Sequence, residues 1–251
     1  MIYKNLPSSW KDLEQKIADI FTDVGCSDVE VEKKITGVRG KSEIDVCARS
    51  KNSFYICECK NWNKAVPKSV VQTFRTILED IGASHGFIIS RRGFQSGAYS
   101  SAKNTNIILV DWYEFQERFE DAWLESVSRF LYKFVTPLFK YTDTLVPRSI
   151  IDPLSESETE YYWKLYSEFI NIWGMADDMA HPFLMPVFDK HEAAKIVRRE
   201  ITFPLELKIP MTTKKIVITD FNGYRDYIIK YVTEGLSKFR KLTQSNSKRD
   251  A

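Results

Sequence analysis

Long hydrophobic runs are missing from this sequence of 251 residues. No uninterrupted apolar stretch approaches the roughly 18 residues that cross a bilayer, and the first residues, MIYKNLPSSWKD, lack the apolar segment of a signal peptide. We therefore expect no membrane association and a soluble protein of the cytosol. Hydrophobic residues still make up 43% of the chain, which is enough to build a substantial core in one large or two small domains.

Cysteine is scarce, and net charge is nearly absent. The four cysteines, Cys26, Cys47, Cys57 and Cys59, all lie in the first quarter of the chain, and no CxxC or paired histidines accompany them. This pattern favours reduced cysteines of a core over a zinc site or a disulfide. The formal charge of +2 does not identify a nucleic-acid binder, although it allows one whose basic residues cluster.

Predicted strands alternate with predicted helices through the first half of the chain. Apolar spacing and turn residues predict helices over 9–24, 70–82 and 94–105, and strands over 29–35, 43–49, 54–60, 85–90 and 107–112. Such alternation is typical of an α/β fold with a mixed sheet flanked by helices. We expect this first domain to span residues 1–115.

The second half is richer in aromatic residues and in helical periodicity. A helical bridge and a linker with Pro147 and Pro153 are expected over residues 116–154. Residues 155–251 should form an α+β domain, with helices over 158–173 and 223–242 and strands over 203–210 and 214–221. Its aromatic side chains could form a core, line a pocket or make a dimer interface: Tyr161, Tyr162, Trp163, Trp173 and Phe183.

The strand FYICECK carries charged residues in an otherwise apolar run. Side chains alternate along a strand, so Glu58 and Lys60 share one face with Phe54 and Ile56. Burial of an unpaired carboxylate or ammonium costs several kcal/mol. The pattern therefore indicates either a buried ion pair or a functional site.

The preceding strand brings a second carboxylate to this place. EIDVCAR and FYICECK flank RSKNS, which suits a hairpin turn centred on Lys51 and Asn52. In that register Asp45 lies opposite Glu58, with Lys60 one step along the same face. Two facing carboxylates repel each other unless a cation lies between them.

Six motifs, in this order and spacing, resemble those of a known nuclease family: WKDLEQKIADIF, SEIDV, FYICECKNW, VVQTF, HGFIISRRGFQSGA and IILVDW. The sequence resembles the PD-(D/E)XK superfamily and, within it, the Mrr-like restriction endonucleases, over roughly residues 8–112. The resemblance implies a restriction-endonuclease-like α/β core that hydrolyses DNA with Mg²⁺, for which Mn²⁺ can substitute. One departure is Glu43, in GVRGKSEID, where many relatives carry glycine-rich or Asp-Gly segments.

The resemblance assigns roles to individual residues. Asp45, Glu58 and the backbone carbonyl of Cys59 would hold the metal, since hard divalent cations prefer oxygen ligands. Lys60 would stabilise the negative charge that develops on the phosphate. Glu14 would complete the metal shell from the first helix, and Gln72 would support the site. Without the resemblance, the pattern of Glu14 indicates part of a solvated helix face. For Asp45, Glu58 and Lys60, a salt-bridged cluster is the alternative to a site.

DNA contacts are expected from residues that rim this site. Exposed basic side chains and an aromatic ring can hold phosphates and stack on bases without reading sequence: Lys41, Trp62, Lys64, Lys68, Arg91 and Arg92. A metal-dependent endonuclease that acts in restriction of foreign or modified DNA is the interpretation that fits best. A structure-specific repair or junction-resolving nuclease and a non-catalytic binding module remain alternatives. A homodimer is expected if both strands of a duplex are cut.

Overall fold

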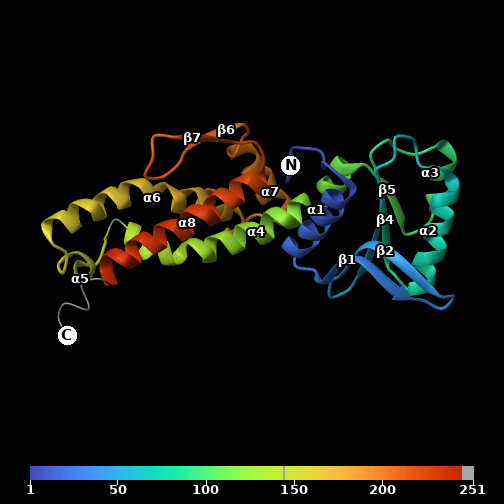
Figure 1. Ribbon diagram of the computed structural model, residues 1–251, viewed down its shortest axis with the longest axis horizontal. Helices are drawn as coiled ribbons and strands as arrows, with labels where there is room; N and C mark the ends of the chain where they lie inside the picture. The colour runs from blue at the N-terminus through green and yellow to red at the C-terminus, as the bar shows by residue number, and fades with distance from the viewer. Residues whose placement is uncertain (144, 245–251) are drawn as a thin grey trace. The chain divides into compact units, whose positions relative to one another are not determined.

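A five-stranded mixed sheet organises residues 3–123 in the computed structural model, which describes residues 1–143 and 145–244 (Figure 1). The strands follow the chain in the order β1 (Ser27–Thr36), β2 (Lys41–Arg49), β3 (Phe54–Lys60), β4 (His85–Ser90) and β5 (Ile107–Val110). The first three strands pair antiparallel, whereas β3, β4 and β5 pair in parallel. The predicted mixed α/β sheet is confirmed.

Helix α1 (Trp10–Asp23) covers one face of the sheet. Ser9 caps its start by accepting a hydrogen bond of 3.1 Å from the N–H of Asp12. On its inner side, the ring of Phe21 stacks on Tyr55 of β3 at 5.4 Å between centroids. Phe115, from the start of helix α4 (Trp112–Thr142), contacts Phe21 on the same face. Aromatic packing therefore fixes α1 against β3.

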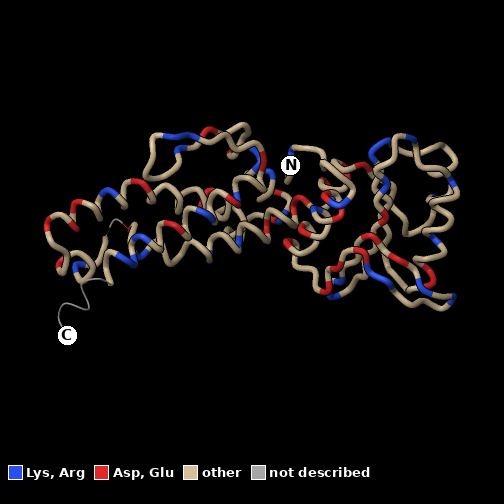
Figure 2. Tube along the Cα trace, viewed as in Figure 1, with Lys and Arg blue, Asp and Glu red and all other residues tan. Residues whose placement is uncertain are grey.

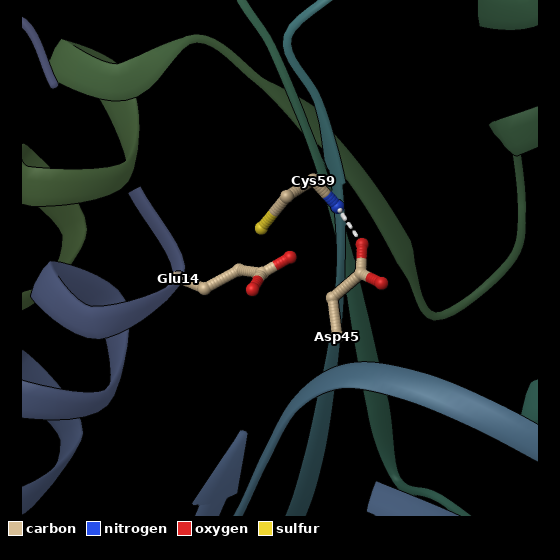
Figure 3. A group of neighbouring side chains, drawn as sticks. All are labelled: Glu14, Asp45 and Cys59. Carbon is tan, nitrogen blue, oxygen red and sulfur yellow. Dashed lines mark hydrogen bonds between the residues drawn. The ribbon is translucent and has the colours of Figure 1, made fainter. Parts of the chain in front are cut away.

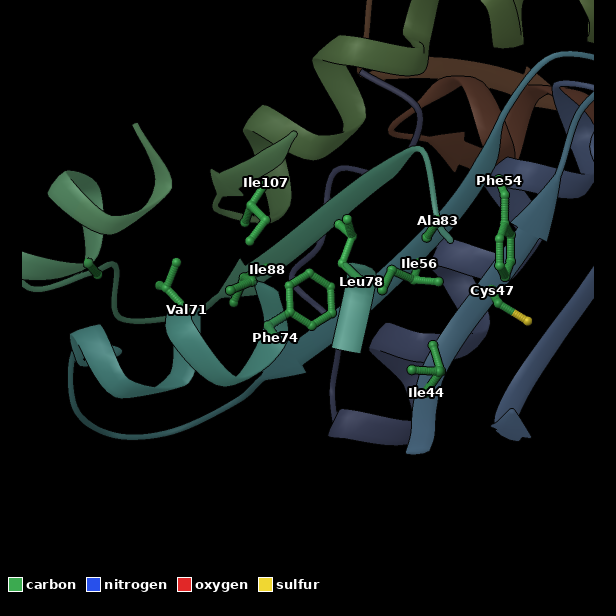
Figure 4. Packing of buried hydrophobic residues seen from close by; sticks show 11 residues of the cluster. Ile44, Cys47, Phe54, Ile56, Val71, Phe74, Leu78, Ala83, Ile88 and Ile107 are labelled. Carbon is green, nitrogen blue, oxygen red and sulfur yellow. The ribbon is translucent and has the colours of Figure 1, made fainter. Parts of the chain in front are cut away.

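Helices α2 (Lys68–Ile81) and α3 (Ser96–Ala102) cover the opposite face. Figure 4 shows Phe74 and Leu78 of α2 facing Ile56 and Ile88 of the sheet. The helix approaches β4 at Gly86, where an added Cβ would lie 2.5 Å from a Leu78 methyl and 2.6 Å from the Phe74 ring. Only glycine fits this approach.

The second compact unit, from Leu124 onward, is mainly helical. It contains the remainder of α4, α5 (Arg148–Ile151), α6 (Glu156–Leu184), α7 (Lys190–Glu200), the hairpin β6 (Leu205–Lys208) and β7 (Lys215–Ile218), and α8 (Phe221–Gln244). The predicted boundary near residue 115 lies inside α4, which continues without a break. The predicted bridge over residues 116–154 is therefore divided between the two units.

Aromatic side chains build much of the core of this second unit. Tyr162 is fully buried and donates a hydrogen bond of 2.7 Å to the carbonyl of Tyr141. Phe239 of α8 stacks on Tyr141 at 5.0 Å. The other predicted aromatic residues differ in exposure: Phe183 is buried and Trp173 packs on Phe139, whereas Tyr161 and Trp163 are exposed. The aromatic residues thus serve mainly as core, with part of them left at the surface.

Acidic and basic residues are interspersed along the trace of both units (Figure 2). No single segment accounts for the small net charge. Across the described part of the chain, no helix is both long and apolar enough to cross a lipid bilayer.

Candidate functional site

Glu14 lies on the buried side of α1, between Leu13 and the core residue Ile17. Only 3% of its surface is exposed, and its Oε2 atom has no hydrogen-bond partner among the described residues. A buried, unpartnered carboxylate oxygen costs free energy. Glu14 is therefore not part of a solvated helix face, and its position needs a ligand or a proton to explain it.

Asp45 lies where β2 separates from β3. The last residues paired between these strands are Val46 and Cys57, in the register expected for a turn centred on Lys51 and Asn52. Beyond this pair β3 continues alongside β4 as far as Lys60. The N–H of Cys59, which no longer meets a backbone carbonyl of β2, donates a hydrogen bond of 2.6 Å to Asp45 Oδ2. This bond fixes the carboxylate at the fork between the strands.

The two carboxylates hold protons more tightly than usual. Burial, together with the nearby Asp45, raises the pKa of Glu14 to about 7. Burial and the charge of Glu58 raise the pKa of Asp45 to about 6, against the opposing effects of the Cys59 N–H and of Lys60. The site therefore contains excess negative charge in water-poor surroundings, which a bound cation would neutralise.

Glu58 and Lys60 point to the opposite face of β3 and form an ion pair. They line a cavity of about 250 Å³ together with Trp62 and residues of α2. The Lys60 ammonium lies 5.2 Å from the centroid of the Trp62 ring, within range of a cation–π interaction. Lys60 is thus held between a carboxylate and an aromatic ring.

Helix α2 contributes Ser69 and Thr73 to this cavity, and not Gln72. Gln72 is exposed and does not line the cavity. The buried residues Val71, Phe74 and Leu78 fix the rotation of the helix. The sequence analysis did not identify Ser69 and Thr73 as cavity residues. The helical spacing of the three apolar residues could have shown it, because this spacing determines which side of α2 faces the sheet.

Cys59 contributes more than its backbone. Its Sγ atom and one carboxylate oxygen each from Glu14 and Asp45 all lie within 4.8 Å of one another. Figure 3 shows the three side chains converging, with the sulfur beside the Glu14 carboxylate. From the sequence, Cys59 is expected to be a core residue that offers only its backbone carbonyl to the metal. The pattern of the strand does not show which helix residues pack against the Cys59 side chain.

The predicted DNA-contacting residues lie on several loops and element ends. Arg91 and Arg92 are exposed after β4, and the N–H of Arg91 donates to the carbonyl of Lys60 at 3.2 Å. Both arginines line a second cavity, of about 300 Å³, whose wall also contains Asn61 and Trp112, which sequence reasoning missed. Lys64 lies 5.8 Å from the Trp62 ring centroid. Lys41 begins β2 and Lys68 begins α2, and both are exposed.

This set of donors fits a divalent cation. Two carboxylates and a further donor atom lie within reach of one another, and one carboxylate oxygen is buried without a partner. Carboxylate oxygens are the ligands that Mg²⁺ and related ions require. The residues present could therefore hold a divalent cation.

Comparison with known proteins relates the first unit to one family. Residues 6–119 match the model of a family described as restriction endonuclease. No match to a curated protein was found. A crystallised protein of unknown function, AF1548, is 16% identical with a TM-score of 0.39, over 76% of this chain and 95% of its own. Protein VC1899 from Vibrio cholerae is 16% identical with a TM-score of 0.37, over 45% of this chain and 34% of its own.

At these TM-scores the two solved structures carry no argument about fold or function. The family match stands independently of them, and it covers the segment that contains Glu14, Asp45, Glu58 and Lys60. The sheet and helices of that segment are those expected for such a core. The match to residues 6–119 agrees with the resemblance to Mrr-like restriction endonucleases of the PD-(D/E)XK superfamily that the sequence motifs indicate.

Proposed function

We propose that this protein is a metal-dependent DNA endonuclease that hydrolyses phosphodiester bonds, with Mg²⁺ as its ion and Mn²⁺ as a substitute. The observation that carries the proposal is the buried Glu14 carboxylate, which lies with Asp45 and Cys59 beside the Glu58–Lys60 ion pair. A structural salt-bridge cluster would pair its acids with bases. Here Glu14 meets another acid instead, and burial together with the charge of Asp45 raises the pKa of Glu14 to about 7.

Each residue has a defined task. Asp45, Glu14 and the Cys59 carbonyl would hold the cation, which would supply charge stabilisation to the scissile phosphate and acidify bound water. Glu58, which the resemblance also assigned to the metal, lies on the other face of β3 and pairs with Lys60. The Cys59 N–H keeps Asp45 oriented. Glu58 and Trp62 hold Lys60 in place, so that its ammonium can stabilise negative charge on the phosphate oxygens. Gln72 receives no role, because it is exposed outside the cavity.

Basic residues around the site suit a DNA backbone. Arg91 and Arg92 follow β4 directly beside Lys60, and phosphate contacts from such loops bind DNA without sequence preference. Lys41, Lys64 and Lys68 are exposed and available for further contacts, and Trp62, which is 37% exposed, could stack on a base. The second unit would recognise DNA or mediate dimerisation, and sedimentation with and without DNA measures the latter.

The biological role that suits this domain is restriction of foreign or modified DNA. The test is cleavage of methylated and unmethylated plasmid with Mg²⁺, Mn²⁺ or EDTA, by wild type, Lys60→Ala and the control Lys51→Ala. Lys60 ends β3, whereas Lys51 is exposed in the turn at the other end of the β2–β3 hairpin.

Cleavage should require metal and fall at least about 100-fold in Lys60→Ala, whereas Lys51→Ala should retain it. DNA binding by Lys60→Ala should persist. Cleavage that survives in EDTA or in Lys60→Ala would refute the proposal. Binding without cleavage in all conditions would instead identify a DNA-binding module.

A further inference from the structure

We propose that the Cys59 thiol is itself a metal ligand, so that the centre formed by Glu14, Asp45 and Cys59 also binds thiophilic ions such as Zn²⁺, Co²⁺ and Cd²⁺, in addition to the Mg²⁺ of the proposed function. This inference rests on the proposed metal site and adds a class of ion that the site accepts through sulfur. It assigns a function to a side chain that the sequence had indicated as part of the core.

The geometry of the strand separates two groups of donors. Because side chains alternate along β3, Cys59 points toward α1, whereas Glu58 and Lys60 point toward α2. Glu58 already has a cationic partner in Lys60. The donors that lack a cation are those on the α1 side, where the sulfur lies with Glu14 and Asp45 (Figure 3).

The distances suit a single ion. The three donor atoms lie within 4.8 Å of one another. Ions with ligand distances of about 2.0–2.3 Å place neighbouring donors roughly 3–4 Å apart. Side-chain rotations within their rotamer wells can supply the remaining approach. The fourth position would remain for water or for a phosphate oxygen, as in catalytic zinc sites.

A second observation points to a ligand at the same place. Glu14 Oε2 is buried and has no hydrogen-bond partner among the described residues. As a residue, Cys59 is intermediate in exposure, whereas the neighbouring Cys57 is completely buried. The unpartnered Glu14 oxygen is thus the second observation that points to a ligand beside the Cys59 sulfur.

The donor set determines the class of ion. Thiolate ligands select Zn²⁺ and other soft or borderline ions, whereas all-oxygen sites suit Mg²⁺. Binding would form one metal–sulfur bond and release the thiol proton to solvent, with no change in oxidation state. The two carboxylates and the thiolate together carry three negative charges, which a divalent ion reduces to one.

Co²⁺ is the probe that reports directly on sulfur ligation, because a Co²⁺–thiolate bond produces a charge-transfer absorption that oxygen ligands do not. We would titrate Co²⁺ into the full-length protein and into Cys59→Ser, Glu14→Gln and the control Cys26→Ser. Cys26 is partly exposed like Cys59, but it lies between α1 and β1. Thermal unfolding of each variant checks that it is folded.

Wild type and Cys26→Ser should show the charge-transfer band, and Cys59→Ser should lose it. Calorimetry should show that Cys59→Ser binds Cd²⁺ at least about tenfold more weakly, while its Mg²⁺ affinity changes little. Glu14→Gln should weaken the binding of both Cd²⁺ and Mg²⁺.

Two results would overturn the inference, and they differ from each other. Visible Co²⁺ bands without sulfur charge transfer would refute thiol ligation but leave the carboxylate centre and the proposed nuclease intact. No binding of Co²⁺, Mg²⁺ or Mn²⁺ by folded wild type would refute the metal centre as a whole.

Discussion

The Asp45 carboxylate accepts a hydrogen bond of 2.6 Å from the N–H of Cys59 at the fork between β2 and β3. One strand thus presents Glu58 and Lys60 on one face and orients Asp45 through its backbone. The position of the aspartate depends on this bond as well as on its own strand. Charge and orientation at Asp45 can therefore be altered separately.

Asp45→Asn removes the charge and retains an acceptor for the Cys59 N–H. It should lower Mg²⁺ affinity at least about tenfold with little loss of stability. Asp45→Ala also leaves that N–H unpaired and should cost about 1–3 kcal/mol of unfolding free energy. Calorimetry and urea unfolding measure the two effects. The control is Glu43→Gln, on the same strand but 60% exposed; if it weakens Mg²⁺ binding equally, general electrostatics and not ligation explains the result.

Metal affinity should rise with pH and level off above about pH 7. Glu14 and Asp45, with pKa values of about 7 and about 6, must lose their protons before a cation binds. Calorimetric titration of Mg²⁺ between pH 5 and 8, in buffers of different ionisation enthalpy, measures both the affinity and the protons released. In Glu14→Gln the rise should end near pH 6. Affinity that is constant over this range would contradict the buried carboxylates as ligands.

Stability without metal should depend on pH with the opposite sign. The pKa of Glu14 is raised to about 7 in the folded protein, above its value of about 4.3 in an unfolded chain. The folded state therefore binds the proton more tightly, and stability declines as pH rises from about 4.3 to 7. Each tenfold change in proton affinity corresponds to about 1.4 kcal/mol.

The Glu14→Gln variant lacks this decline. In EDTA it should be more stable than wild type at pH 8, by about 2–3 kcal/mol, and similar to wild type near pH 4.5. Urea unfolding at both pH values measures the difference. Equal destabilisation of the variant at both would show that the Glu14 carboxylate makes a structural bond when ionised.

Arg91 and Arg92 should contribute to DNA affinity through phosphates. Each alanine substitution should weaken binding to all sequences alike and reduce the slope of log affinity against log salt by about 1. The backbone N–H of Arg91 still binds the Lys60 carbonyl in the variant. Arg75→Ala on α2, an exposed arginine paired with Glu79, is the control. An unchanged slope in both loop variants would remove these arginines from the DNA interface.

The hairpin shows what the sequence could predict. A turn centred on Lys51 and Asn52 fixes which residues of β2 and β3 face each other, and the observed register agrees. Alternation along β3 then places Glu58 and Lys60 together, but the Asp45 carboxylate, which we expected on the same face, lies instead with Glu14 and Cys59. These are local constraints, which turn chemistry and strand periodicity encode.

Contacts between distant elements were harder to predict. The sulfur of Cys59 lies near Glu14 only because α1 packs on the face of β3 that carries Cys59. The periodicity of neither segment predicts this packing. The exclusion of Gln72 from the cavity depends on the rotation of α2. Helix α7 was missed, although Asp189 and Glu192 form a capping box at its start, because its few apolar residues give a weak pattern.

Gly86 allows helix α2 to pack closely on β4, near the cavity that contains Lys60. Its missing side chain lets Phe74 and Leu78 rest directly on β4, and the same helix carries Ser69 and Thr73 to the cavity around Lys60. Any larger residue at position 86 would push α2 away from β4. Because α2 forms one wall of the cavity around Lys60, the width of that cavity depends on the absence of a side chain at Gly86.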